Sequence, residues 1–249
     1  MQYHVNSWSF GREMGPLQLI EWDDDGGKHV VQTEGTDPAR MTLSELITRL
    51  GKQGYRGVEL AYVHLRDMSE EGLRRLRDDA GQAGVELTSL LLDFGDPSSA
   101  DEARRAAERD LYRRWIRAAE QAGFRRVRIG AGQASPEDEA AFDRAADMLR
   151  ELADFAERGG IRLVTENLGR LLSRSDRVLK MLRACGGLRQ LQDGEIPAVG
   201  GHPPASGDDP CQGVGGRRRP TRFDGFSQMR GAGPKDRLPR AVLADVSRR

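Results

Sequence analysis

The sequence predicts an α/β fold, an incomplete (β/α)8-type barrel in which about five strand-helix units can be read. Short apolar segments alternate with amphipathic segments of helical period, and helical segments end at glycine just before the next apolar one. This alternation predicts parallel strands joined by right-handed crossovers. No G-x-G-x-x-G motif follows the first predicted strand, so a doubly wound dinucleotide-binding sheet has little support.

The first unit is interrupted by a long insertion. Residues 3–10 suit a strand, and residues 11–40 are rich in glycine and aspartate, which predicts a long loop of the kind that is often functional. Thr42, with a glutamate three positions later, forms a capping box that opens an amphipathic helix. That helix is expected to end at Gly51 or Gly54.

The next two units follow the same order. Residues 56–65 predict a strand, and Ser69 caps a helix whose leucines share one face. Gly84 ends this helix and leads into a second apolar strand at residues 85–94. A third helix is predicted over about residues 101–122.

The last two readable units complete the pattern. Residues 124–132 predict a short strand followed by a glycine-containing loop, and residues 135–137, Ser-Pro-Glu, predict a helix start. Residues 161–167 predict the fifth strand, and residues 175–185 a fifth helix. Residues 1–187 are therefore expected to form a partial barrel domain.

The composition and the hydrophobic pattern of the sequence change from Leu188 onward. Most of the chain's 11 prolines fall there, and apolar periodicity is lost. Residues 188–249 are therefore expected to form an irregular or disordered tail. The basic stretch GGRRRPTR is nearly offset by nearby aspartates, which favours a solvated tail over a nucleic-acid-binding arm.

The amino-acid composition bears on which classes of partner the protein binds and on the compartment in which it works. Lys plus Arg and Asp plus Glu are 39 each, so the net charge does not indicate nucleic acid, a membrane surface or an acidic partner. Cys185 and Cys211 are too few for a disulfide framework and lack zinc-site spacing. No signal-like leader or membrane-length apolar run is present, so we expect a soluble, cytoplasmic protein.

Four segments carry a resemblance to a known family. They are GYRGVELAYVHL from Gly54, VELTSLLLDFGD from Val85, FRRVRIGAG from Phe124 and GIRLVTENLG from Gly160. Together they resemble the sugar phosphate isomerase/epimerase family, the xylose isomerase-like TIM-barrel group that also includes apurinic endonuclease relatives. The G-Y-x-G-V-E strand paired with an apolar strand ending in Glu-Asn is the most specific element.

The resemblance implies a metal-dependent site around Glu166. In that family a glutamate at this point binds a divalent metal, Mn²⁺ or Mg²⁺, together with an Asp, a His and a second Glu from strands six to eight. A carboxylate at the carboxyl end of a barrel strand faces the mouth, and hard cations prefer oxygen ligands. The alternative is that Glu166 caps a turn, although a carboxylate directly after Leu-Val-Thr is costly without a partner.

The implied activity is isomerisation or epimerisation of a small-molecule sugar or sugar phosphate. Such a reaction needs a base to remove a carbon-bound proton and an acid to return one. The metal polarises the carbonyl, and two carboxylates move the proton. By resemblance Glu166 is one of them, and the second comes from the eighth strand, for which this sequence shows no match.

Four further residues are expected near the same mouth. Glu59 is an inward-facing candidate for substrate binding, and Asp93, after three leucines, is similar. For His64, substrate contact and a hydrogen bond to backbone or solvent are equal alternatives. Asn167 is expected to orient Glu166 or to bond substrate hydroxyls. Two other functions stay open, a metal-dependent phosphodiesterase of the apurinic endonuclease type and a non-catalytic barrel remnant.

The loss of pattern near Leu188 suggests that the coding frame slips there. Read one base downstream, the codons for residues 209–212 permit Ile-His-Ala-Lys, which resembles the family's seventh-strand histidine motif. The codons for residues 237–244 permit Gly-Tyr-Arg-Gly-Pro-Tyr-Ser-Leu, which resembles its eighth strand. On this hypothesis the chain lacks most metal ligands and has weak or absent activity.

Overall fold

A computed structural model describes residues 2–185, and its central element is a five-stranded parallel sheet. The strands lie in the order β1 (His4–Asn6), β4 (Gly57–Ala61), β5 (Glu86–Leu92), β6 (Arg126–Ile129) and β7 (Arg162–Val164). This arrangement confirms the predicted fold class, an α/β TIM-barrel-like fold with five readable units. The predicted tail at residues 188–249 and the frame hypothesis lie outside the described residues.

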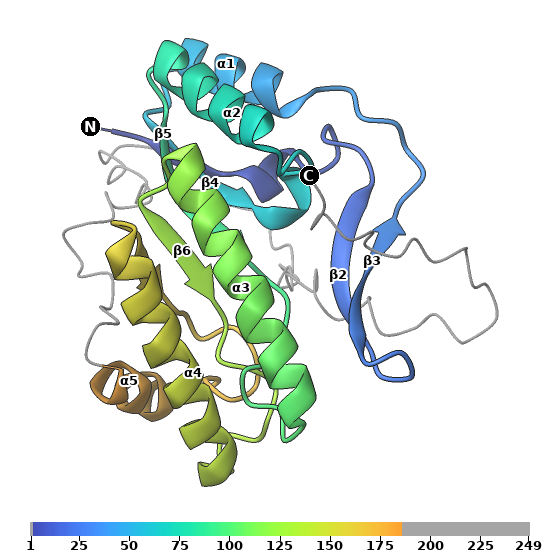
Figure 1. Cartoon of the computed structure of the whole chain (residues 1–249). Helices are drawn as coiled ribbons and strands as arrows, with labels where there is room; N and C mark the ends of the chain where they lie inside the picture. Colours follow the sequence, from blue (N-terminus) through green and yellow to red (C-terminus); the bar gives the residue numbers. More distant parts are fainter. Residues whose placement is uncertain (1, 186–249) are drawn as a thin grey trace, which may run out of the picture. The chain divides into compact units, whose positions relative to one another are not determined.

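A helix precedes each strand from β4 to β7, and a fifth helix follows β7 (Figure 1). They are α1 (Leu43–Lys52), α2 (Glu70–Ala83), α3 (Glu102–Ala122), α4 (Glu139–Arg158) and α5 (Ser175–Ala184). Consecutive helices from α1 to α5 pack against one another. Among the described helices, none is both long and apolar enough to cross a membrane.

Local sequence signals determine where several of these helices begin and end. Thr42 and Glu45 form the predicted capping box, in which Thr42 Oγ1 accepts from Glu45 N–H at 3.2 Å and Glu45 Oε2 accepts from Thr42 N–H at 2.7 Å. Gly84 and Gly123 end α2 and α3 in the left-handed conformation, at φ of 64° and 85°. A residue with a Cβ is strained at such angles, which explains glycine at both positions.

The hydrophobic core lies between the helices and one face of the sheet. Side chains alternate along each strand, so every second residue points towards the helices. The strand residues in this buried layer include Val58, Leu60, Leu90, Leu92, Val127, Ile129 and Leu163, together with Leu87, which precedes an irregularity in the pairing of β4 with β5. The intervening residues therefore point to the other face, the inner face of the barrel, and the candidate site residues of the strands lie there.

Several predicted boundaries were wrong. The strand predicted at residues 56–65 ends at Ala61, where a 3-10 helix begins, and the strand predicted at residues 161–167 ends at Val164. The first strand ends at Asn6, and Ser7–Phe10 form a short 3-10 helix, η1, because the Asn6 side chain accepts from Trp8 N–H at 3.0 Å. Helix α4 begins at Glu139 instead of residues 135–137. Its N-cap is Asp138, whose carboxylate accepts a hydrogen bond from the helix backbone, an interaction that fixes the start of a helix.

The long insertion contains a β-hairpin where the sequence predicted only a loop. Its strands β2 (Leu17–Asp23) and β3 (Lys28–Glu34) pair antiparallel. The turn residues Asp-Asp-Gly-Gly between two partly alternating segments were the available signal. Ile20 N–H donates to the Tyr62 hydroxyl at 3.3 Å, which attaches the hairpin just past the carboxyl end of β4.

Candidate active site

Glu166 lies just beyond the carboxyl end of β7, on the inner face of the sheet. Leu91, Arg128 and Val164 are in register across β5, β6 and β7, and paired residues of parallel strands point to the same face. Asp93 and Glu166 follow Leu91 and Val164 by two positions. Both carboxylates therefore lie on the inner face, one layer nearer the mouth than Arg128.

The long side chain of Arg128 reaches up into this layer and bridges the two carboxylates. Its Nη1 lies 2.9 Å from Glu166 Oε1, and its Nη2 forms an ion pair with Asp93 Oδ1. The second oxygen of Asp93 faces the Trp8 indole nitrogen at 3.4 Å. A continuous chain of polar contacts thus runs from just past β1, through β5 and β6, to Glu166 beyond β7.

Burial shifts the acidity of Glu166. Desolvation raises the pKa of its carboxyl group above the usual value, Arg128 opposes this shift, and the negative charges of Asp93 and Glu59 add to it. A carboxylate with a raised pKa is a stronger base than an ordinary one. Glu166 is therefore suited chemically to acid-base work.

Glu59 also points to the inner face. It lies on β4 in register with Asn6 and Ser89, and its side chain is half-buried. Its negative charge adds to the upward shift in the pKa of Glu166. Glu59, Asp93 and Glu166 thus lie on the inner face, Glu59 in the middle of β4 and the other two just beyond the ends of β5 and β7.

His64 is buried beside Trp8, just past the carboxyl end of β4. It ends a short 3-10 helix, η2 (Tyr62–His64), that follows β4, and only 3% of the residue is exposed. Its Nδ1 lies 2.9 Å from the hydroxyl of Ser7, and its ring packs edge-on against Trp8 with centroids 5.5 Å apart. Of the two alternatives for His64, this geometry favours a structural hydrogen bond within the protein.

Asn167 lies in the loop after β7 and is exposed. It does not take part in the contacts that join Arg128 to Asp93 and Glu166. The sequence interpretation missed Arg128 and Trp8. The signal for Arg128 was a charged residue at an inward-facing position of a short apolar strand, where an unpaired charge is costly.

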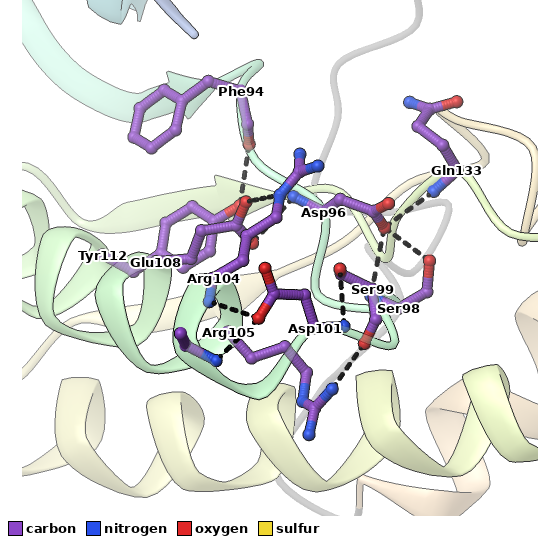
Figure 2. A network of polar contacts seen from close by, with 11 residues as sticks. Phe94, Asp96, Ser98, Ser99, Asp101, Arg104, Arg105, Glu108, Tyr112 and Gln133 are labelled. Atoms are coloured by element: carbon purple, nitrogen blue, oxygen red, sulfur yellow. Dashed lines mark hydrogen bonds and ion pairs between the residues drawn. The ribbon is translucent and has the colours of Figure 1, made fainter. Parts of the chain in front are cut away.

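A second polar network joins the loops that follow β5 and β6 (Figure 2). Asp96 lies in the loop after β5, and Gln133 lies in the loop after β6. Asp96 Oδ1 accepts from Gln133 N–H at 3.0 Å and from Ser98 N–H at 3.1 Å. Glu108 of α3 is fully buried and accepts from Asp96 N–H at 2.8 Å and from Arg104 Nε at 2.9 Å. These bonds tie together the loops that follow Asp93 and Arg128.

The described residues do not by themselves fit a divalent metal. Within residues 2–185, no group of three or more His, Cys, Asp or Glu side chains is arranged to hold an ion. Glu166 Oε1 and Asp93 Oδ1 both accept from Arg128 instead. The resemblance places the other ligands on barrel strands six to eight, and none of these strands lies among the described residues.

Solved structures share this architecture. A D-psicose 3-epimerase crystallised with D-fructose matches with a TM-score of 0.53 and 20% identity, over 75% of this chain and 60% of that one. An L-ribulose 3-epimerase matches with a TM-score of 0.53 and 20% identity, over 75% of this chain and 58% of that one. A probable 3-DHS dehydratase from Bacillus anthracis matches with a TM-score of 0.52 and 17% identity, over 75% of this chain and 60% of that one. At such identities the likeness establishes the fold.

The chain spans about 60% of the length of these structures. No curated protein sequence matches it. The family model described as "Xylose isomerase-like TIM barrel" matches residues 47–191, more than half of the chain, and includes β4 to β7 and Glu166. This match agrees with the parallel sheet and with the four resembling segments. The chain therefore belongs to the xylose isomerase-like TIM-barrel family.

Proposed function

We propose that this chain derives from an isomerase or epimerase of sugars or sugar phosphates, in which Glu166 moves the proton next to a carbonyl. The position of Glu166 carries the proposal, because it lies at the carboxyl-end face where catalytic residues of such barrels gather. Its raised pKa supports an acid-base role. The two sugar epimerases among the similar structures agree with this substrate class.

The proposed chemistry begins with proton removal. The Glu166 carboxylate takes the proton from the carbon beside the carbonyl, and the electron pair moves into an enediolate. A second acid then returns a proton to carbon, either at the neighbouring position or on the opposite face. We assign Glu59 and Asn167 to the sugar hydroxyls, and His64 to the support of Trp8 at the edge of the site.

A divalent metal would supply the polarisation of the carbonyl in this family's chemistry. Because the described residues alone do not fit such an ion, no step above depends on one. The phosphodiesterase alternative needs a multi-ligand metal cluster, and no observation among the described residues favours it. The non-catalytic alternative has one supporting observation, because an ion pair to Arg128 can hold Glu166 in a purely structural role.

Deuterium exchange tests the proposal without requiring net conversion. The purified chain is incubated in D₂O with a panel of ketoses and ketose phosphates, with and without Mn²⁺ or Mg²⁺, and exchange beside the carbonyl is followed by NMR. We expect slow exchange that falls by about 100-fold or more in Glu166→Gln. The matched control is Glu86→Gln, a carboxylate paired with Arg125 at the opposite end of the sheet, which should retain exchange.

Two results would count against the proposal. Absence of exchange with every sugar, at a sensitivity that detects a few turnovers per day, would favour the non-catalytic alternative. Equal exchange rates in the wild type and in Glu166→Gln would show that Glu166 does not move the proton.

A further inference from the structure

Arg128 supplies the positive charge nearest to Glu166. The side chain of Arg128 is 16% exposed and that of Asp93 is 19% exposed, whereas Glu166 is 37% exposed. The Asp93 half of the bridge is thus the more buried half. An ion pair that is shielded from water is screened less by solvent than a surface pair.

Asp93 anchors Arg128 in this position. One Asp93 oxygen accepts from the Arg128 guanidinium, and the other faces the indole nitrogen of Trp8 at 3.4 Å. Both oxygens of Asp93 are therefore engaged. Glu166 is more exposed than Asp93 and is bonded to Arg128 only at Oε1. Its bond to Arg128 is therefore the easier of the two to break.

A divalent cation and Arg128 compete for the Glu166 carboxylate, because Arg128 already holds one of its two oxygens. Hard cations bind carboxylate oxygens at about 2.0–2.6 Å. The guanidinium already occupies Glu166 Oε1 at 2.9 Å. Two cations on one oxygen also repel each other, so a metal ion can bind Glu166 fully only if Arg128 withdraws, and Asp93 opposes that withdrawal.

We propose that Arg128 is a positioning residue that acts as the built-in counter-cation of Glu166, fixing this carboxylate and excluding divalent cations from it in the resting protein. The inference rests on the proposed function only in treating Glu166 as the acting group. Its test measures cation binding instead of turnover, so each of the two proposals can fail while the other stands.

Mn²⁺ binding to the purified full chain tests this proposal, with free Mn²⁺ measured by electron paramagnetic resonance. We expect Arg128→Gln to bind Mn²⁺ at least about ten-fold more tightly than the wild type. The double variant Arg128→Gln with Glu166→Gln should lose that gain. Arg113→Gln is the matched control, because Arg113 also bridges two carboxylates, Asp110 and Glu151, but lies on α3 away from the inner face.

Circular dichroism identifies the variants that fold. Arg128→Lys, which keeps one charge on a shorter side chain, should give a smaller gain and decides the question if Arg128→Gln does not fold. In the wild-type background, Glu166→Gln alone should leave Mn²⁺ affinity unchanged. The proposal is overturned if neither Arg128 variant gains affinity, if Arg113→Gln gains as much, or if Glu166→Gln removes Mn²⁺ binding from the wild type.

Discussion

The hydroxyl of Ser7 lies 2.9 Å from Nδ1 of His64, and both residues are almost fully buried. The same Ser7 oxygen accepts from Ala61 N–H at 2.9 Å. Ser7 immediately follows β1, whereas Ala61 and His64 mark the end of β4 and the turn after it. One hydroxyl thus joins two neighbouring strands where they approach the candidate site.

Ser7→Ala should destabilise the protein by about 1–3 kcal/mol, because it leaves a buried N–H and a buried imidazole nitrogen without their partner. The free energy of unfolding from urea denaturation measures this loss. Ser9→Ala is the control, since Ser9 belongs to the same 3-10 helix but is exposed, and it should change stability by less than about 0.5 kcal/mol. Equal effects of the two substitutions would show that the buried bonds contribute little.

The pKa of His64 predicts a specific loss of stability in mild acid. Desolvation, with a smaller effect from Arg66, lowers the pKa of His64 from 6.5 to about 4. Between these values the unfolded chain binds a proton that the native chain does not, so this contribution to stability is complete above pH 6.5 and is lost as the pH falls towards 4.

Urea unfolding of wild type and His64→Asn at pH 7 and pH 4.5 isolates this contribution. The wild type should lose roughly 2–3 kcal/mol more than the variant over that interval, from the size of the shift. The pKa of His29 is also lowered to about 4, but His29 is present in both proteins, so its contribution to the difference between them cancels. Parallel pH profiles for the two proteins would show that His64 is not held neutral by burial.

The sequence predicted the repeating units because their signals are local. Capping residues such as Thr42, and glycines at left-handed positions such as Gly84, act within one helical turn. They therefore fix element ends without tertiary information. The start of α4 was wrong because Ser135 and Asp138 are both good N-caps, and the choice between them depends on packing.

The candidate site was predicted only in part because its contacts join distant residues. The strand order indicates that Asp93 and Glu166 follow their strands at the same end of the sheet, whereas Glu59 lies in the middle of β4. The Arg128 bridge depends instead on the relative register of β5, β6 and β7, which no local pattern encodes. The burial of His64 likewise depends on Ser7, which is 57 positions away in the chain.

Glu108 should be the costliest carboxylate of α3 to remove. Glu108→Ala leaves Asp96 N–H and the Arg104 guanidinium without a buried partner, for an expected loss of about 3–5 kcal/mol in the free energy of unfolding. Glu108→Gln keeps an acceptor of similar size and should cost less. Glu102, which pairs with Arg105 on the same helix but is 80% exposed, is the control, and Glu102→Ala should cost under about 1 kcal/mol.

Thermal or urea unfolding of the three variants ranks these costs. If Glu108→Gln is as damaging as Glu108→Ala, the negative charge itself is required. If Glu102→Ala matches Glu108→Ala, burial does not decide the energetics of these pairs and the argument fails.

Gly132→Ala should directly disturb the loops that follow β5 and β6. Gly132 has φ of 115°, and a Cβ added there would lie 2.8 Å from Ser98 Cβ and in contact with the Asp96 carboxylate. Strain and overlap together should cost about 2–4 kcal/mol of stability. Gly81→Ala is the matched control, because Gly81 is an exposed position within α2 with open space around it.

Gly81→Ala should stabilise the protein by up to about 1 kcal/mol, because alanine favours the helical conformation. Urea unfolding gives both free energies, and proton exchange of the Gln133 amide shows whether its bond to Asp96 is lost in Gly132→Ala. We expect faster exchange at that amide in Gly132→Ala and no change in Gly81→Ala. A stable Gly132→Ala protein with a protected Gln133 amide would mean that the Asp96 network does not require the close approach of these two loops.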